Sequence, residues 1–322
     1  MQKNEGRAGT HTHTSLLSLI DGKRPTLAST APAIADGAWG TELQKLGLPV
    51  GDCPDEWNLT RPDAVRGVAE SYLRAGSQFI LTNTFGANPF QLSRHGLEKR
   101  MVEINQAGAR ISVEMAALVR RETGRDDIVV LGDIGPSGKL LLMGDVTEEE
   151  LFAGFSAQAK ALVHAGVQGL IVETMSDVEE MAIAVRAARS TRMPVVASMT
   201  FDRNAHGEYH TMMGNTPALF VERANLAGAT AIGANCGTGI ESYVSLAAQL
   251  RKLTDKPVWI KANAGMPELV DGKAVYSMDP EDYCSYAAQI ILAGVDMIGG
   301  CCGTDPRFIA AIAKKLRASE RA

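Results

Sequence analysis

Short apolar runs recur along this chain, and each interval between them is long enough for a helix. From Ala31 onward these runs are bounded by Gly or Pro and alternate with segments whose apolar residues recur every three or four positions. Fully buried parallel strands have this continuous apolar character. Eight strands are expected, at residues 33–35, 78–82, 128–132, 169–172, 195–199, 229–233, 258–261 and 295–299.

The segments between the runs carry helix start signals. Thr147 precedes three glutamates, which is a capping-box pattern, and Thr216, Asp279 and Asp305 each precede a proline. Helical periodicity follows at residues 151–165, 178–189, 243–253 and 283–293. Eight strand–helix repeats without a break in composition predict one α/β domain, a (β/α)8 TIM barrel over residues 31–322, after a flexible lead of residues 1–30. The alternative is an open doubly wound sheet, but no glycine-rich dinucleotide turn follows the first strand.

Two cysteine segments follow the sixth and eighth expected strands. The first is Gly-Ala-Asn-Cys-Gly around Cys236, and the second is Gly-Gly-Cys-Cys-Gly-Thr with Cys301 and Cys302. Neighbouring residues of a regular strand point to opposite faces, so Cys301 and Cys302 reach one ion only where the chain leaves β geometry, which the flanking glycines allow. Three thiolates would hold Zn²⁺ and leave its fourth position open, as catalytic zinc sites do. The alternative is three small buried cysteines without a metal.

Polar residues stand at the ends of all eight expected strands. The active site of a (β/α)8 barrel lies at the carboxyl ends of its strands, so these side chains are expected to meet at one mouth. They are Asp36, Asn83, Asp133, Glu173, Thr200, Asn235, Cys236, Asn263, Cys301 and Cys302.

The two cysteine segments resemble the zinc segments of the homocysteine S-methyltransferases. That family includes betaine–homocysteine methyltransferase, S-methylmethionine-dependent enzymes and the homocysteine domain of cobalamin-dependent methionine synthase. Residues 35–43, 81–87 and 171–175 are similar to its first-, second- and fourth-strand motifs, and the resemblance runs in order over residues 35–308. It implies a cytoplasmic zinc-dependent enzyme that moves a methyl group from a small donor to homocysteine, giving methionine.

The resemblance and the residue types together suggest roles in the site. Cys236, Cys301 and Cys302 are expected to hold Zn²⁺, with the sulfur of homocysteine as the fourth ligand, because a metal-bound thiol is deprotonated at neutral pH. Glu173 lies at a family motif position and is expected to bind the substrate ammonium group, helped by Asp36. A helix cap or a structural ion pair is the alternative for Glu173, and a turn aspartate bonded to its own backbone is the alternative for Asp36.

The remaining substrate contacts are expected in the first two strand loops. The amides of Gly37, Ala38, Trp39 and Gly40 form a turn that could cradle the substrate carboxylate, as such turns do for anions. Asn83, at the end of the second strand, is expected to line the same site.

The methyl donor is open between three classes. An onium donor such as betaine calls for an aromatic cage, to which Trp39, Trp57 and Phe85 could contribute, although packing is as good an explanation for each. Animal betaine enzymes carry tyrosines where this chain has Gly86 and Thr174, so it departs from their cage. S-methylmethionine and a methyl-corrinoid are the other classes; the chain lacks an Asp-x-His-x-x-Gly signature, so a corrinoid is expected on a separate protein.

Other functions compete with this interpretation. A related enzyme could pass a methyl group from a methylated amine or ether to a corrinoid protein. A zinc-storing or regulatory barrel without catalysis, and a phosphate-binding metabolic barrel with metal-free cysteines, are further alternatives.

Bulk properties narrow the surroundings of the protein. A net charge of −5 argues against a nucleic-acid partner. Five cysteines in 322 residues do not form a disulfide framework, so a reducing, cytoplasmic compartment is expected. No apolar run approaches the roughly 18 residues of a membrane-spanning helix, so no membrane association is expected. The oligomeric state stays open, a homo-oligomer included.

Overall fold

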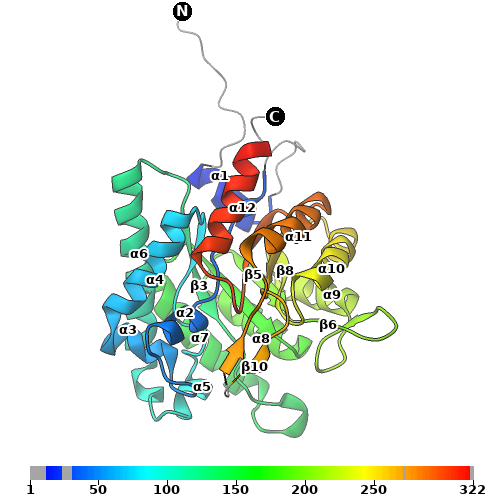
Figure 1. Cartoon of the computed structure of the whole chain (residues 1–322). Helices are drawn as coiled ribbons and strands as arrows, with labels where there is room; N and C mark the ends of the chain where they lie inside the picture. The colour runs from blue at the N-terminus through cyan, green and yellow to red at the C-terminus, as the bar shows by residue number, and fades with distance from the viewer. Residues whose placement is uncertain (1–11, 24–30, 271–272, 320–322) are drawn as a thin grey trace, which may run out of the picture.

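The computed structural model describes residues 12–23, 31–270 and 273–319, and eight parallel strands form a barrel at its centre (Figure 1). The sheet order is β1-β12-β9-β8-β5-β4-β3-β2, and a parallel bridge between Ala35 and Phe79 joins its two ends. All eight expected strands are confirmed, and the open-sheet alternative is wrong. The barrel strands are β1 (Ala33–Ile34), β2 (Phe79–Leu81), β3 (Val129–Ile134), β4 (Gly169–Met175), β5 (Val195–Met199), β8 (Ala231–Cys236), β9 (Val258–Ala262) and β12 (Met297–Gly300).

Helices alternate with the strands and surround the barrel. The longer ones are α4 (Pro62–Ala75), α6 (Met101–Thr123), α7 (Glu148–His164), α8 (Val178–Arg189), α9 (Pro217–Ala227), α10 (Ile240–Leu253), α11 (Pro280–Leu292) and α12 (Pro306–Ser319). The side chains of Thr147, Thr216 and Asp279 accept hydrogen bonds from amides of the following turn, so these expected caps are confirmed.

Shorter elements lie in the loops after the strands. They are α2 (Gly40–Lys45), α3 (Trp57–Thr60), α5 (Pro89–Ser93), the 3₁₀ turns η1 (Pro54–Glu56), η2 (Glu98–Arg100) and η3 (Leu141–Met143), and two hairpins, β6 (Asp202–Arg203) with β7 (Tyr209–His210) and β10 (Glu268–Val270) with β11 (Lys273–Val275). The hairpins were not expected from the sequence.

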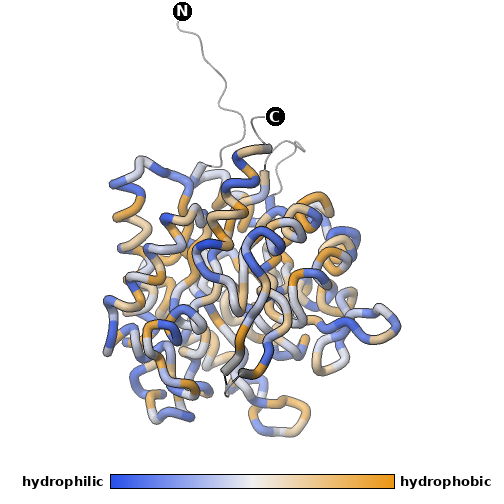
Figure 2. Tube along the Cα trace, in the orientation of Figure 1, coloured by the Kyte–Doolittle hydropathy of each residue, from blue (hydrophilic) through white to orange (hydrophobic). Residues whose placement is uncertain are grey.

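Alternate strand residues belong to two different cores. Val129, Leu131 and Ile171 pack in the barrel interior, whereas Val130 and Leu170 pack outward under the helices. This alternation is the period of two expected of a strand buried on both faces. Figure 2 shows the result, with apolar segments running through the inside and polar segments on the outer turns of the helices.

Part of the expected flexible lead is a helix that closes one end of the barrel. Residues 1–11 and 24–30 lie outside the described residues, but α1 (His13–Ile20) buries Leu16, Leu19 and Ile20 in the interior core. His13 Nδ1 lies 2.8 Å from the carbonyl oxygen of Ile128, just before β3. The expectation of a flexible lead is therefore wrong for residues 13–20. Their apolar side chains lie on one face of α1, and this face covers the open end of the barrel. Figure 1 shows α1 at the end opposite β10.

None of the helices that the structure describes is both long and apolar enough to cross a bilayer.

Candidate metal and substrate site

Three cysteine sulfurs meet at the carboxyl ends of β8 and β12. The Sγ atoms of Cys236, Cys301 and Cys302 all lie within 4.8 Å of one another. Cys236 has a φ of 66°, which is rare for a residue other than glycine, and the chain turns directly after Gly300 at the other pair. The expected departure from β geometry at Cys301 and Cys302 is confirmed.

The thiol cluster suits a zinc ion. Tetrahedral zinc with sulfur at about 2.3 Å separates its sulfurs by about 3.8 Å, which the spacing here accommodates. Soft thiolate donors without a carboxylate select zinc over magnesium or calcium. All three cysteines are partly exposed, so a further ligand can reach the cluster.

The thiols interact strongly even without a cation. Hydrogen bonds from Cys301 and Cys302 lower the pKa of Cys236 to about 3, and the bond to Cys236 raises the pKa of Cys302 to about 12. One thiolate is thus stabilised at neutral pH by two neighbouring thiols, and this negative charge attracts a cation.

Two polar side chains hold the cluster in place. Asn263 donates from Nδ2 to the carbonyl oxygen of Gly237 at 2.6 Å and lies 3.7 Å from the Cys236 sulfur. The hydroxyl of Tyr276, just after β11, hydrogen-bonds the Cys302 sulfur. A Cβ on Gly303 would lie 2.2 Å from the Tyr276 ring, so this contact depends on glycine. Sequence reasoning missed Tyr276, because its unexpected hairpin carries it to the cluster.

Asp36 is the partner of a buried lysine. Its Oδ1 accepts from Lys261 Nζ at 2.6 Å, and its Oδ2 accepts from Trp39 Nε1 at 2.9 Å and from the Leu81 amide at 2.8 Å. Asp36 is fully buried, and Lys261 is only 3% exposed. Burial alone would lower the pKa of Lys261, but the carboxylates of Asp36 and Glu173 raise it above its usual value. Asp36, which was expected to help bind the substrate ammonium group, thus has its carboxylate in an ion pair with Lys261.

Lys261 was missing from the expected site, although the sequence carried a signal for it. A lysine between Ile260 and Ala262 interrupts an otherwise apolar strand. A charge inside a barrel requires a partner of opposite sign, so this residue could have been paired with a strand-end acid.

Glu173 lies near the end of β4 with one oxygen unsatisfied. It is 7% exposed, and its Oε2 has no hydrogen-bond partner. The helix-cap alternative is wrong, because Asp177 caps α8. Burial raises the pKa of Glu173 to about 7, although the nearby Lys261 opposes this rise.

Asn235 of β8 fixes the backbone at the end of β4. Thr174, next to Glu173, has a φ of 59°, and its amide donates to Asn235 Oδ1 at 2.9 Å. Asn235 also donates to the Thr174 hydroxyl and accepts from Ser198. This network holds the end of β4 against β8, the strand that carries Cys236.

The turn at Gly37–Gly40 is partly committed to internal contacts. The amide of Ala38 donates to Thr304 Oγ1 at 3.2 Å, so the expected cradle does not have all four amides available. Gly37 admits no side chain, because a Cβ there would lie 2.7 Å from the ring of Tyr72. Trp39 is the N-cap residue of α2, and Gly40 is its first residue.

Asn83 ties a loop to the barrel. Its Nδ2 donates to the carbonyl oxygen of Pro54 at 2.8 Å and to Asn58 Oδ1 at 3.0 Å. The segment around η1 and α3 thus occupies the side-chain nitrogen of Asn83, the residue expected to line the substrate site.

The aromatic residues proposed for a donor cage have other contacts. The guanidinium of Arg61 lies 4.3 Å from the ring centroid of Trp57, which is itself buried. Trp39 is bonded to Asp36 through its indole nitrogen, and Phe85 is partly exposed. Arg61 thus occupies one face of the Trp57 ring.

The two other cysteines are away from this chemistry. Cys53 and Cys284 are buried, and burial raises the pKa of both, to about 12 for Cys53. A thiol that stays protonated is a poor nucleophile and a poor metal ligand.

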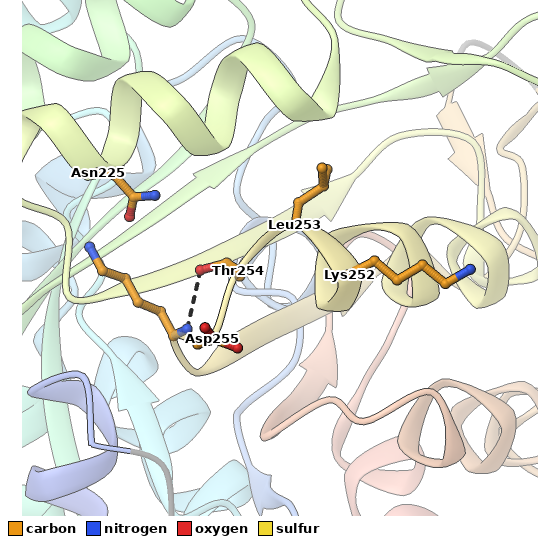
Figure 3. A pocket seen from close by; sticks show the side chains of 6 residues that line it. Asn225, Lys252, Leu253, Thr254 and Asp255 are labelled. Carbon is orange, nitrogen blue, oxygen red and sulfur yellow. Dashed lines mark hydrogen bonds between the residues drawn. The ribbon is translucent and has the colours of Figure 1, made fainter.

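A hollow of about 500 Å³ lies at the opposite end of the barrel, where α9 and α10 end (Figure 3). Figure 3 shows Asn225 facing the turn that carries Thr254 and Asp255. None of the expected site residues lines it, and the lining is Asn225, Lys252, Leu253, Thr254, Asp255 and Lys256.

Comparisons with known proteins point to one family. The family model described as homocysteine S-methyltransferase matches residues 33–316. The chain is 29% identical over 306 residues to a methionine synthase of Mycobacterium tuberculosis, covering 89% of this chain and 25% of that protein. A methionine synthase of Mycobacterium leprae is 28% identical, with 87% and 24% covered. The chain thus spans about a quarter of the length of these relatives.

Solved structures share the fold. The metallated form of the homocysteine methyltransferase MmuM from Escherichia coli superposes with a TM-score of 0.74 at 24% identity, covering 89% of this chain and 96% of that one. Its apo form gives 0.72 at 23% identity, with 91% and 98% covered.

Proposed function

Because the chain belongs to the homocysteine S-methyltransferase family, we propose that it transfers a methyl group to the sulfur of homocysteine at the mouth formed by β8 and β12. The observation that carries this proposal is the meeting of three thiols from two strands at the same end of the barrel as a buried carboxylate with an unsatisfied oxygen. A purely structural cysteine cluster would need neither the carboxylate nor access from outside.

Cys236, Cys301 and Cys302 are the residues that would hold Zn²⁺. The chemistry that such an ion supplies is loss of the substrate thiol proton at neutral pH, which leaves a nucleophilic sulfur. The chain's own residues orient the cluster: Asn263 fixes the turn after Cys236, and Tyr276 donates to the Cys302 sulfur.

The polar end of homocysteine is bound below the thiols. Glu173 offers the acceptor for the substrate ammonium group, because its Oε2 is buried and has no partner within the protein. The amides of Gly37, Trp39 and Gly40 remain our candidates for the substrate carboxylate, without Ala38. Asp36 acts through Lys261 and Trp39 and does not contact the substrate in this proposal.

Apolar side chains around the mouth bear on the donor. Leu142, Met143, Met212 and Leu269 are 83%, 71%, 81% and 80% exposed, and all lie in loops after the carboxyl ends of strands. Leu142 and Met143 are adjacent in η3, and exposed apolar residues that stand together mark interaction surfaces. A methyl-corrinoid carried by a separate protein therefore stands in our proposal beside betaine and S-methylmethionine.

The test combines metal content with methyl transfer. Protein purified under reducing conditions is analysed for zinc by elemental mass spectrometry and incubated with homocysteine and each donor in turn, with methionine measured by mass spectrometry. We expect stoichiometric zinc and methionine from one donor class, in the wild type and in the Cys284→Ser control. Freshly reduced protein that neither contains nor takes up zinc would overturn the proposal. Methyl transfer from an amine or ether to a corrinoid protein, without methionine formation, would establish the demethylase alternative.

A further inference from the structure

On two neighbouring strands, the inward-facing residue changes from apolar to acidic from one inward-facing position to the next. On β3, Asp133 comes two residues after Leu131, and on β4, Glu173 comes two residues after Ile171. Leu131 and Ile171 both belong to the interior core, so each acid faces the same side as its apolar neighbour. The two carboxyl groups thus stand on adjacent strands and face the barrel interior. Asp133 is in register with Ile171, so Glu173 lies one inward-facing position nearer the mouth.

Both carboxyl groups have an oxygen without a partner. Asp133 is 4% exposed and its Oδ1 makes no hydrogen bond, as is true of Oε2 of Glu173. The backbone of Asp133 is satisfied, because Thr82 Oγ1 accepts from its amide and Thr84 donates to its carbonyl oxygen. The unsatisfied atoms are therefore the carboxylate oxygens alone, and an unpartnered buried acceptor is costly unless a ligand satisfies it.

The charges around the pair favour a cation. Glu173, Lys261, Asp36 and Asp55 act on Asp133, and Lys261, Asp36 and Cys236 act on Glu173. The positive charge of Lys261 is held by Asp36 at 2.6 Å. Lys261 is therefore already paired, and no second cation among these groups balances the carboxylates of Asp133 and Glu173.

Protonation of the pair agrees with this geometry. Burial and repulsion from Glu173 raise the pKa of Asp133 well above its usual value, and burial raises the pKa of Glu173 to about 7. Both shifts favour the protonated form of the ligand-free pair, and an incoming ammonium group would favour the ionised form and release of a proton.

We propose that Asp133 is a specificity-determining residue that binds the ammonium group of the thiol substrate together with Glu173. This inference rests on the proposed function and changes the assignment made from the sequence. Lys261 withdraws Asp36 from the ammonium group, and Asp133 takes its place on the neighbouring strand.

The test compares two thiols that differ only in the ammonium group. Homocysteine and 4-mercaptobutyrate are titrated into zinc-loaded protein by isothermal calorimetry, so no methyl donor is needed. In Asp133→Asn we expect the affinity for homocysteine to fall about 10- to 100-fold, as for loss of a hydrogen bond to a charged group, while that for 4-mercaptobutyrate is unchanged. Glu180→Gln is the matched control, because Glu180 is a buried acid whose Oε1 accepts from the amide and the hydroxyl of Ser137.

Proton release provides a second measurement that needs no variant. Titrations of the wild type in two buffers of different ionisation enthalpy count the protons released. We expect homocysteine to release more protons than 4-mercaptobutyrate, because both lose a thiol proton but only the ammonium group displaces the proton of the acid pair.

The outcomes distinguish a failure of the role assigned to Asp133 from a failure of the proposed function. Equal affinity losses for both thiols in Asp133→Asn would make Asp133 a structural residue, and equal proton release for both thiols would remove the acid pair from the site. If the zinc-loaded wild type binds neither thiol, the proposed function fails, and the ammonium site fails with it. Tight homocysteine binding that is unaffected in Asp133→Asn overturns only the role of Asp133.

Discussion

Lys261 and Asp36 form an ion pair of 2.6 Å across strand β12, which separates their own strands β9 and β1 in the sheet. Gly299 of β12 pairs in register with Lys261 and carries no side chain that could stand between the two charges. The pair places a positive charge in the barrel interior and engages the Asp36 carboxylate, which is the basis on which we propose that Asp36 does not contact the substrate directly.

Breaking this pair should be strongly destabilising. We expect Lys261→Met to lower the free energy of unfolding by about 3–5 kcal/mol, because it leaves the Asp36 charge buried without its cation. Urea unfolding followed by circular dichroism measures this. Adding Asp36→Asn should cost less than the sum of the two single changes. The control is Lys45→Met, whose ion pairs with Glu42 and Asp305 involve a side chain that is 57% exposed, and which should cost at most about 1 kcal/mol. Comparable losses of unfolding free energy in both lysine variants would mean that the buried pair contributes no more to stability than the exposed one.

Removal of a single thiol should separate metal binding from folding. Cys236→Ser and Cys301→Ser are expected to lose zinc and methyl transfer and to keep the wild-type circular dichroism spectrum, because the barrel cores contain neither residue. Elemental analysis of the purified variants measures the zinc. Full activity in a metal-free cysteine variant would end the proposed mechanism.

Tyr276 should affect metal affinity without being a ligand. We expect Tyr276→Phe to weaken zinc binding about 10-fold, because it removes the hydrogen bond to the Cys302 sulfur while keeping the ring. Competition with a chromogenic chelator gives the affinity. Tyr286→Phe on α11 is the control. Unchanged affinity in Tyr276→Phe would mean that its hydroxyl does not support the cluster.

Asp55 should make stability depend on pH in a predictable direction. Burial raises its pKa from 3.8 to about 6 in the folded protein, so the fold binds a proton that the unfolded chain releases. The cost of ionising Asp55 is absent below pH 3.8 and grows as the pH rises to about 6.

Asp55→Asn removes this cost and keeps an oxygen for the Gly86 amide. We expect the variant to be more stable than the wild type above pH 6, by on the order of 1–3 kcal/mol, with the difference vanishing toward pH 4. Thermal or urea unfolding at several pH values provides the comparison. A difference that is the same at pH 4 and pH 8 would show that ionisation of Asp55 is not its cause.

The floor helix should contribute to global stability. Leu16 is fully buried in the interior core, whereas its neighbour Leu17 is only partly buried. Leu16→Ala is expected to cost about 2–5 kcal/mol, as for other large-to-small core changes, and Leu17→Ala clearly less. Urea unfolding of the two variants compares them directly, and similar small losses would mean that α1 does not close the barrel in solution.

Local patterns made much of the fold and part of the site predictable. The apolar runs located all eight strands, and the residues before each proline located three helix starts, because strand burial and helix capping depend on neighbouring residues. The meeting of Cys236, Cys301 and Cys302 could be predicted, since the carboxyl ends of all strands in a parallel barrel lie at the same end of the barrel. Tyr276 and α1 could not be placed, because a short hairpin and an eight-residue helix acquire their positions only from the surfaces they cover.

The sequence by itself determined the barrel, the side on which its polar residues gather and the three thiols of the cluster. Only the tertiary structure decided which partner each of the acids contacts. Asp36, Asp133 and Glu173 all stand at strand ends, and no spacing along the chain distinguishes them. Their roles follow from which one lies within hydrogen-bonding distance of Lys261, and that depends on strands brought together by barrel closure. A buried charge takes its role from the partner beside it in space, and the order of residues does not record that partner.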